Sequence, residues 1–316
     1  MKKKNKIIAL VTLLLVILIA LVVYLYNHNV AVLNPAGTIG QHELWLIIFA
    51  SLLSLIVVVP VFVLLAVISL KYRESNQKNV KYNPDFDHSR AIEAVWWIVP
   101  SAIILVLSIV TWRSSYQLNP YKTIASKKSP LSIEVVALDW KWLFIYPNQH
   151  VASVNFFEFP VNTPVSFNVT SDAPMNSFWI PQLGSQIYAM PGMSTKLNLM
   201  ASKIGAYHGD SANISGIGFA GMNFIAKAAT NSSYNHWMQQ LEHSSKTLSL
   251  SAYNQLAKPS RNNPVAYYAH VQQGLYANIV MKYMNPNYGS NYAKYVKTYN
   301  NLPTVTKSNT SGAKQL

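Results

Sequence analysis

Residues Leu44–Leu70 read LWLIIFASLLSLIVVVPVFVLLAVISL, and this stretch decides the fold class because it contains no Asp, Glu, Lys or Arg. A helix needs about 20 mostly apolar residues to cross ~30 Å of hydrocarbon, and this run is long enough. Two further uncharged apolar runs flank it, at Ile7–Tyr26 and Ala94–Thr111. We therefore predict a membrane protein whose spans lie within the first 112 of its 316 residues.

The orientation of the spans is predicted by the basic residues around them. Lysines crowd the segment before the first run, Lys2–Lys6, and the segment between the second and third runs is also basic, at Lys71, Arg73, Lys78, Lys81 and Arg90. Short cytoplasmic segments are enriched in Lys and Arg. Both segments are therefore expected in the cytoplasm, which puts everything after Arg113 on the outer side of the membrane.

The first apolar run has two interpretations. A secretory signal has a short basic start and an apolar core of about 7–15 residues. The core of Ile7–Tyr26 is longer, and no clear small-x-small cleavage site follows it. A retained helix is favoured over a cleaved signal, and the topology of the remaining chain is the same in both cases.

Between Pro130 and Ala229 the pattern changes to short segments rich in Val, Ile, Phe and Thr, separated by Pro, Gly, Asn and Asp. These segments read LSIEVVAL, ASVNFFEFP, TPVSFNVTS, SFWIPQLG, TKLNLMAS and NFIAKAA. Several short strands at this spacing are typical of a β-sandwich. We predict an all-β Greek-key sandwich on the outer side of the membrane.

Beyond Thr230 the residues change again. Tyr234–Leu256 and Pro264–Met284 have helix-like apolar spacing and many aromatic residues. The last stretch is polar without a sustained period, so we expect it to be largely disordered. The predicted divisions are an N-terminal apolar segment, a transmembrane hairpin, a sandwich domain, an aromatic-rich helical region and a tail, at residues 1–30, 31–118, 119–230, 231–284 and 285–316.

Composition excludes several classes of function. The net charge is +14, but the basic residues are dispersed and not clustered on the outer domain, which argues against a nucleic-acid partner. The chain has no cysteine, so it forms no disulfide, thiolate metal site or cysteine nucleophile. It also lacks G-x-S-x-G, a Gly-rich phosphate loop and H-E-x-x-H, and we expect no catalytic residue on this chain.

Five separated motifs resemble the subunit II family of haem-copper respiratory oxidases, in the branch of bacterial cytochrome bo type ubiquinol oxidases. They are LNPAGTIG at Leu33–Gly40, KYRESN at Lys71–Asn76, EAVWWIVP at Glu93–Pro100, DWKWLFIYP at Asp139–Pro147 and MNSFWIPQLGSQIYAMPGM at Met175–Met193. The region after Tyr234 resembles the aromatic-rich motif that quinol-oxidase subunits carry. The resemblance implies transmembrane helices, a cupredoxin-like Greek-key sandwich and a short helical, aromatic-rich C-terminal segment.

The segment SANISGIGFAGM, Ser211–Met222, resembles the copper-binding loop of this family without its ligands. Copper-bearing relatives have Cys, Cys, His and Met in this loop, a glutamate between the cysteines, and a further His in the turn that here reads MNSFW. The corresponding residues are Ser211, Ser215, Phe219, Met222, Asn213 and Asn176. Thiolates suit copper and a serine hydroxyl does not replace them. We expect no metal here, and Met222 is expected to be an apolar residue packed in the sandwich.

The resemblance implies a non-catalytic subunit of a proton-pumping quinol oxidase in the bacterial plasma membrane. Haems and copper are expected on the catalytic subunit I, with no cofactor on this chain. The expected partners are subunit I, the other subunits and membrane lipid, without soluble cytochrome c. Two alternatives stay open: a copper-bearing electron-entry subunit of a cytochrome c oxidase, and a stand-alone membrane-anchored binding or assembly protein.

Other residues with possible chemistry have simpler interpretations. Glu93 precedes the third apolar run on the cytoplasmic side, and the resemblance links the glutamate of this motif to the entrance of a proton channel. A carboxylate at a helix N-terminus, stabilised by the helix dipole, is the equally weighted alternative.

Trp140 and Trp142 are expected to serve packing. His236 and His243 lie seven residues apart with no cluster of metal-binding side chains around them.

Overall fold

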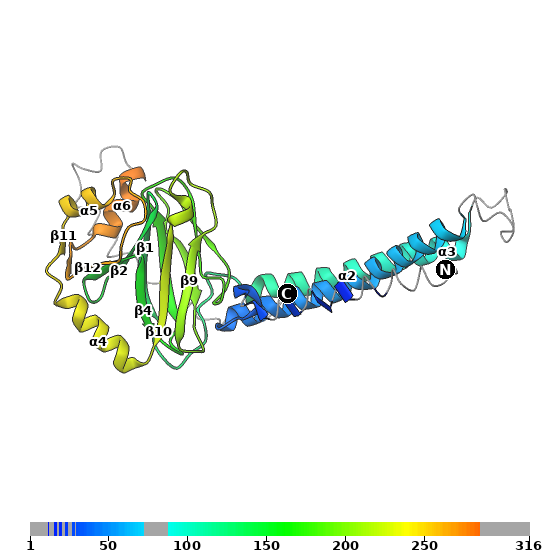
Figure 1. The fold of residues 1–316 in the computed structure, drawn as a ribbon. Helices are drawn as coiled ribbons and strands as arrows, with labels where there is room; N and C mark the ends of the chain where they lie inside the picture. Colours follow the sequence, from blue (N-terminus) through cyan, green and yellow to red (C-terminus); the bar gives the residue numbers. More distant parts are fainter. Residues whose placement is uncertain are drawn as a thin grey trace, which may run out of the picture.

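The computed structural model describes residues 30–72 and 88–284, with scattered residues between 12 and 28. These residues form a helical hairpin that projects from one end of a β-sandwich, as Figure 1 shows. The predicted first span lies largely outside the described residues. The predicted disordered tail and most of the basic segment between the second and third apolar runs also lie outside them.

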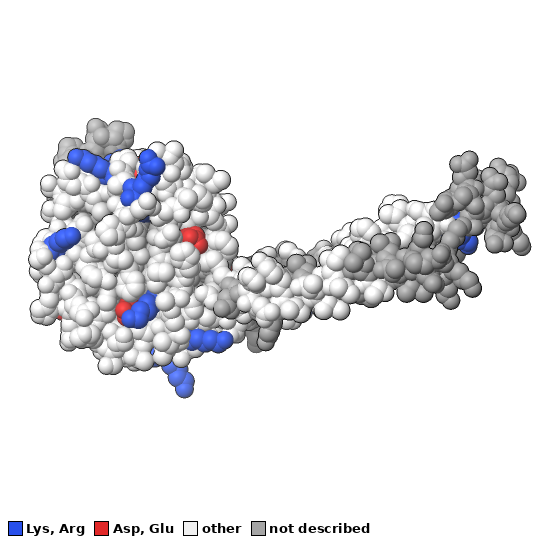
Figure 2. Space-filling model, in the orientation of Figure 1, with Lys and Arg blue, Asp and Glu red and all other residues white. Residues whose placement is uncertain are grey.

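The hairpin consists of α2 (Thr38–Lys71) and α3 (Arg90–Gln117), which both extend away from the sandwich (Figure 1). They are the two helices of the described residues that are long and apolar enough to cross a membrane. Both extend beyond the apolar runs, because the polar residues at their ends also adopt helical geometry. Figure 2 shows a face of the hairpin without charged side chains over most of its described length. This surface suits lipid or partner helices.

The LNPAGTIG motif joins the hairpin to the sandwich. The short 3-10 helix η1 (Ala31–Leu33) leads into this motif, and the backbone N–H of Ala36 donates to the Gln182 carbonyl at 2.8 Å. The Gly40 N–H donates to the Leu183 carbonyl at 3.0 Å. A Cβ on Gly37 would lie 2.6 Å from the Leu183 carbonyl oxygen, so the close approach of the two backbones requires glycine here.

Two sheets form the sandwich, which confirms the predicted fold class. The six-stranded sheet has the order β12-β3-β2-β1-β5-β8, with β12 at Ala266–Tyr268, and the five-stranded sheet has the order β4-β10-β9-β6-β7. The pairs β1/β5 and β4/β10 are parallel, and the other pairs are antiparallel. The strands are β1 (Leu131–Leu138), β2 (Lys141–Tyr146), β3 (Val151–Val154), β4 (Phe156–Pro160), β5 (Val165–Ser171), β6 (Asn176–Trp179), β7 (Ile187–Ala189), β8 (Thr195–Leu199), β9 (Gly205–Ser211) and β10 (Asn223–Ala229).

The predicted strand ASVNFFEFP is divided between the two sheets. Asn155 has a φ of 57°, which turns the chain from β3 in one sheet to β4 in the other. Its side chain fixes this corner, since its Oδ1 accepts the Trp142 N–H at 2.8 Å and its Nδ2 donates to the Asn263 carbonyl at 2.9 Å. Asparagine tolerates this left-handed conformation better than most residues.

Aromatic side chains fill the space between the sheets. Phe178 and Phe224 stack with ring centroids 5.1 Å apart, and Trp142 meets both rings edge-on. All three side chains are at most 1% exposed. Burying large aromatic rings is the main stabilising contribution of such a core.

The aromatic-rich region covers the outer face and one edge of the six-stranded sheet. Its elements are α4 (Asn231–Glu242), β11 (Thr247–Leu248), α5 (Leu250–Leu256), β12 (Ala266–Tyr268), β13 (His270–Val271) and α6 (Leu275–Met284). The expected helical character is confirmed in α4, α5 and α6, although neither Tyr234–Leu256 nor Pro264–Met284 is one continuous helix. β11 interrupts the first, and the second begins as β12, which pairs antiparallel with the edge strand β3. The hydrogen bonds that an unpaired sheet edge offers outweigh the helical spacing of the apolar residues.

Candidate functional site

The loop that resembles a copper site connects β9 to β10. It follows Ser211, the last residue of β9, and contains the 3-10 helix η3 (Phe219–Gly221). Strand β6 pairs with β9 in the same sheet, with Phe178 opposite Ser211. The pairing brings Asn176, which is distant in sequence, next to the start of the loop.

Three of the six predicted ligand positions form a hydrogen-bonded group. The Ser211 hydroxyl donates to Asn176 Oδ1 at 3.0 Å and lies 3.3 Å from the Asn213 carbonyl. Ser177 donates to Asn213 Oδ1 at 2.7 Å, and Asn176 Nδ2 donates to the Pro174 carbonyl at 2.7 Å. Asn176 and Ser211 are buried. Their polar groups therefore find protein partners within the loop and the adjacent strand.

The other three positions do not join this group. Ser215 has a buried hydroxyl without a hydrogen-bond partner within the described structure. Phe219 is half-buried in η3. Met222 is 2% exposed and belongs to the apolar core between the sheets, so its thioether is packed among hydrophobic side chains.

The Trp140 side chain packs against the backbone of the β9–β10 loop. Its Nε1 donates to the Ser215 carbonyl at 3.2 Å, and a Cβ on Gly218 would lie 2.3 Å from the indole Cδ2. The loop backbone therefore rests directly on the ring. Trp142, two residues on, is fully buried in the core. The two tryptophans pack in different places, a distinction that their sequence spacing does not reveal.

The donor atoms of the loop do not fit a dinuclear copper centre. They are hydroxyl and amide groups plus one buried thioether, whereas copper of this type needs soft thiolate and imidazole ligands. No three His, Cys, Asp or Glu side chains come together anywhere in the part of the chain that the structure describes. His236 contacts Gln240 at 3.2 Å, and His243 contacts the Gln239 carbonyl at 2.6 Å, so each ring interacts within α4 or at its end.

Glu93 lies in the first turn of α3 and is half-exposed. Its Oε1 accepts the backbone N–H of Ser89, the N-cap residue, at 3.1 Å. This contact is the one expected of a carboxylate at a helix N-terminus. A role in a proton path stays a prediction.

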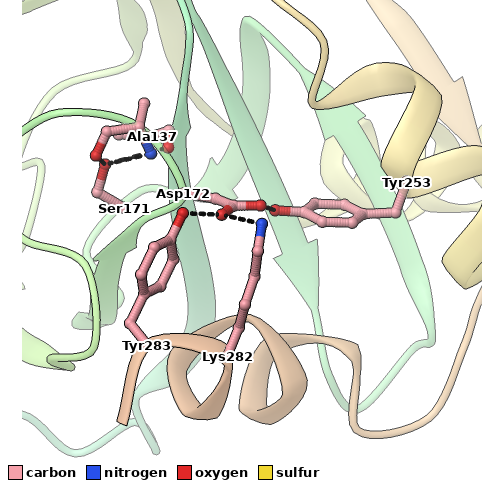
Figure 3. A network of polar contacts seen from close by, with 7 residues as sticks. Ala137, Ser171, Asp172, Tyr253, Lys282 and Tyr283 are labelled. Carbon is pink, nitrogen blue, oxygen red and sulfur yellow. Dashed lines mark hydrogen bonds and ion pairs between the residues drawn. The ribbon is translucent and has the colours of Figure 1, made fainter. Parts of the chain in front are cut away.

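Two acidic residues that look isolated in the sequence form contacts over long distances. Asp172, directly after β5, accepts hydrogen bonds from Tyr253, Lys282 and Tyr283, which come from α5 and α6 (Figure 3). Glu158 pairs with Lys227 at 2.7 Å between the parallel strands β4 and β10. The partners are 69 to 111 residues away, so sequence spacing gave no signal for either contact.

Comparison with known proteins identifies the family. Residues 110–229 match the family model described as "Cytochrome C oxidase subunit II, periplasmic domain", and residues 243–287 match "COX Aromatic Rich Motif". The cytochrome bo(3) ubiquinol oxidase subunit 2 of Pseudomonas aeruginosa is 48% identical over 255 residues, which cover 81% of this chain and 77% of that protein. The chain belongs to the subunit II family of haem-copper oxidases.

Other members of the family are equally similar. The protein with the same name from Pseudomonas putida is 49% identical over 261 residues, 83% of each chain. The ubiquinol oxidase subunit 2 of Acetobacter aceti is 47% identical over 256 residues, 80% of this chain and 83% of that protein. These matches confirm the resemblance inferred from the five motifs. The chain is thus part of an oxidoreductase complex, with a membrane anchor and the family's periplasmic domain.

Proposed function

We propose that this chain is the copper-free, non-catalytic subunit II of a proton-pumping respiratory quinol oxidase, which oxidises ubiquinol and reduces dioxygen to water. The observation that carries the proposal is the pairing of Ser211 with Asn176, at 3.0 Å, where copper-bearing relatives would place a thiolate and an imidazole. The names of the similar proteins support the same substrate class.

In this role the chain supports the catalytic subunit. Ile214 and Ile217 of the loop are 85% and 75% exposed, although isoleucine is usually buried. A partner that covers the loop would remove both side chains from water. The apolar surfaces of α2 and α3 offer a second contact, to the spans of subunit I and to lipid.

The proposal assigns the electron carriers to the partner. Haems and copper would reside on the catalytic subunit, and quinol would deliver electrons within the membrane. A docking site for soluble cytochrome c on the sandwich is then unnecessary. Lys71 is the last residue of α2 and Arg90 is the first residue of α3, and basic residues favour the cytoplasmic side. The sandwich, at the other end of both helices, would then lie on the periplasmic side of the bacterial plasma membrane. Glu93 lies at that cytoplasmic end, where protons would enter.

The test is purification through an affinity tag on this chain. We expect haem-bearing subunits to co-purify, with oxygen uptake driven by ubiquinol and not by reduced cytochrome c. Copper analysis of the complex should give only the copper of the catalytic subunit. Two additional coppers per chain, with near-infrared absorption, would establish the electron-entry alternative. Purification without haem would establish the stand-alone alternative.

A further inference from the structure

A cavity of about 330 Å³ lies on the outer face of the six-stranded sheet, next to the start of α6. None of the residues that line it belongs to the β9–β10 loop or to the hairpin. Its lining combines polar and apolar groups, among them Glu134, Ile145, His150, Val271, Gln273 and Leu275. The volume is at the lower end of the range of small-molecule sites, so a ligand here would be small.

Glu134 lies where an apolar layer on this face of the sheet begins, since its neighbours are Ser132 and Val136 along β1, Asn168 on β5 and Ile145 on β2. Side chains alternate along a strand, so Glu134 shares its face with Val136 and Leu138, and both are fully buried beneath the aromatic-rich region. Ile145, opposite Glu134 on β2, belongs to the same apolar layer. Within the described residues, no hydrogen bond or ion pair reaches the Glu134 carboxylate. An acidic side chain in such a layer is costly unless something compensates its charge.

The groups around the cavity do not supply that compensation. Among the described residues no Lys or Arg lines it, although the whole chain carries a net charge of +14. The other titratable side chains of the lining are His150, which is exposed at the turn between β2 and β3, and Tyr276 of α6. The Tyr276 hydroxyl is 2.8 Å from Ser194 Oγ. Burial raises the pKa of Glu134 to about 7, so the carboxyl group changes its charge near neutral pH.

We propose that this cavity binds a small organic ammonium ion, with the ammonium group on the Glu134 carboxylate and its short carbon chain against Ile145, Val271 and Leu275. A cation is favoured over an anion because the one acidic side chain of the lining would repel an anion. A divalent metal ion is disfavoured because it needs several oxygen ligands, and the lining offers one carboxylate. The proposal is independent of the subunit's role in quinol oxidation.

The test uses three probes of nearly the same size: n-butylammonium, butan-1-ol and butyrate. Each is titrated calorimetrically into the purified complex that contains the full chain. We expect saturable binding of butylammonium only, and at least tenfold weaker binding in Glu134→Gln, which keeps the shape and removes the charge. The matched control Glu242→Gln, an exposed acid on α4, should bind like the wild type. Unchanged hydrogen exchange of β1 in Glu134→Gln would show that the variant is folded.

Proton linkage gives a second readout. At pH 6 the carboxyl group is mostly protonated, and the ammonium ion keeps its own proton, so binding should release a proton from Glu134 to the buffer. Calorimetry in buffers of different ionisation heat measures this release, which should vanish above about pH 8. His150→Asn, which tolerates the φ of 57° at this turn, should leave the release intact. No saturable binding, equal binding of butyrate, or unchanged affinity in Glu134→Gln would each overturn the proposal.

Discussion

Asp172→Asn should loosen the aromatic-rich region while leaving the sandwich intact. The Asp172 carboxylate accepts Lys282 Nζ at 2.7 Å, Tyr253 OH at 2.6 Å and Tyr283 OH at 2.5 Å, and it is only 1% exposed (Figure 3). Burial, followed by the neighbouring carboxylate, raises the pKa of both tyrosines above the usual range. Both phenols therefore donate throughout the neutral pH range. An asparagine amide could accept only some of these bonds.

The expected loss follows from these contacts. Hydrogen bonds to a charged group contribute about 1.5–3 kcal/mol each. Lys282 is 55% exposed and regains water when its partner is lost, so the ion pair itself adds little. We expect a local destabilisation of about 2–4 kcal/mol, which reduces hydrogen-exchange protection roughly 30- to 1000-fold.

Hydrogen exchange of the purified complex, resolved by peptide, measures this change. The loss of protection should be confined to α5, α6 and the segments between them. Asp210→Asn is the matched control, because Asp210 is 42% exposed and its contact with His208 is 3.5 Å long. The control should change protection by less than about 0.5 kcal/mol. Unchanged exchange in α6, or an equal rise throughout the sandwich, would refute the role of Asp172 as the link between β5 and these helices.

Three further predictions concern other sites. Since burial raises the pKa of Glu134 from 4.5 to about 7, the folded state binds the proton more tightly than the unfolded chain. Stability should therefore fall as pH rises from about 4.5 to 7, by roughly 1–3 kcal/mol. Thermal unfolding at pH 5 and 8 should show this fall in the wild type and not in Glu134→Gln. Gly218→Ala places a Cβ against Trp140 and should cost about 1–3 kcal/mol. Tryptophan fluorescence and loop exchange would reveal the displacement, and a spectrum like that of the wild type would contradict it. Glu93→Gln should slow proton delivery during haem reduction in stopped-flow measurements, whereas unchanged turnover and pumping would leave only the helix-capping role.

The sequence predicted the layers of the fold because these depend on local patterns. Uncharged runs longer than a membrane's thickness identify α2 and α3, and β-branched and aromatic segments identify most strands. The division at Asn155 could not be predicted in this way, since its positive φ depends on hydrogen bonds to Trp142 and Asn263, which are distant along the chain. The same holds for β12, whose strand conformation depends on pairing with β3.

The sequence identified the position of the candidate site but not the contacts that hold it. The resemblance to the family's copper-binding loop identified the loop and its replaced ligand positions. The support from Trp140 was not predictable, because it requires the left-handed backbone at Trp140, with a φ of 62°, and the approach of Gly218. Glu134 escaped notice because a single acid in a strand gives no pattern. Its significance comes from the helix that covers it.

The β9–β10 loop and the aromatic-rich region are in contact in the structure. The segment between α5 and β12 belongs to the aromatic-rich region and reaches the ligand-free loop, where a Cβ on Gly221 would lie 2.3 Å from Asn262 Oδ1. Lys141, beside Trp140, holds this segment by donating to the Lys258 carbonyl at 2.9 Å and to Ser260 Oγ at 2.5 Å. Burial lowers the pKa of Lys141, and the nearby negative charge of Asp139 partly offsets this effect. The lowered pKa is consistent with an amine that serves as a hydrogen-bond donor inside the fold and not as a surface charge. Since β2 carries Lys141 and Trp140 precedes this strand directly, a shift of the start of β2 would move both the loop and the aromatic-rich region. The loop and the motif are therefore expected to vary together, as parts of one packed surface.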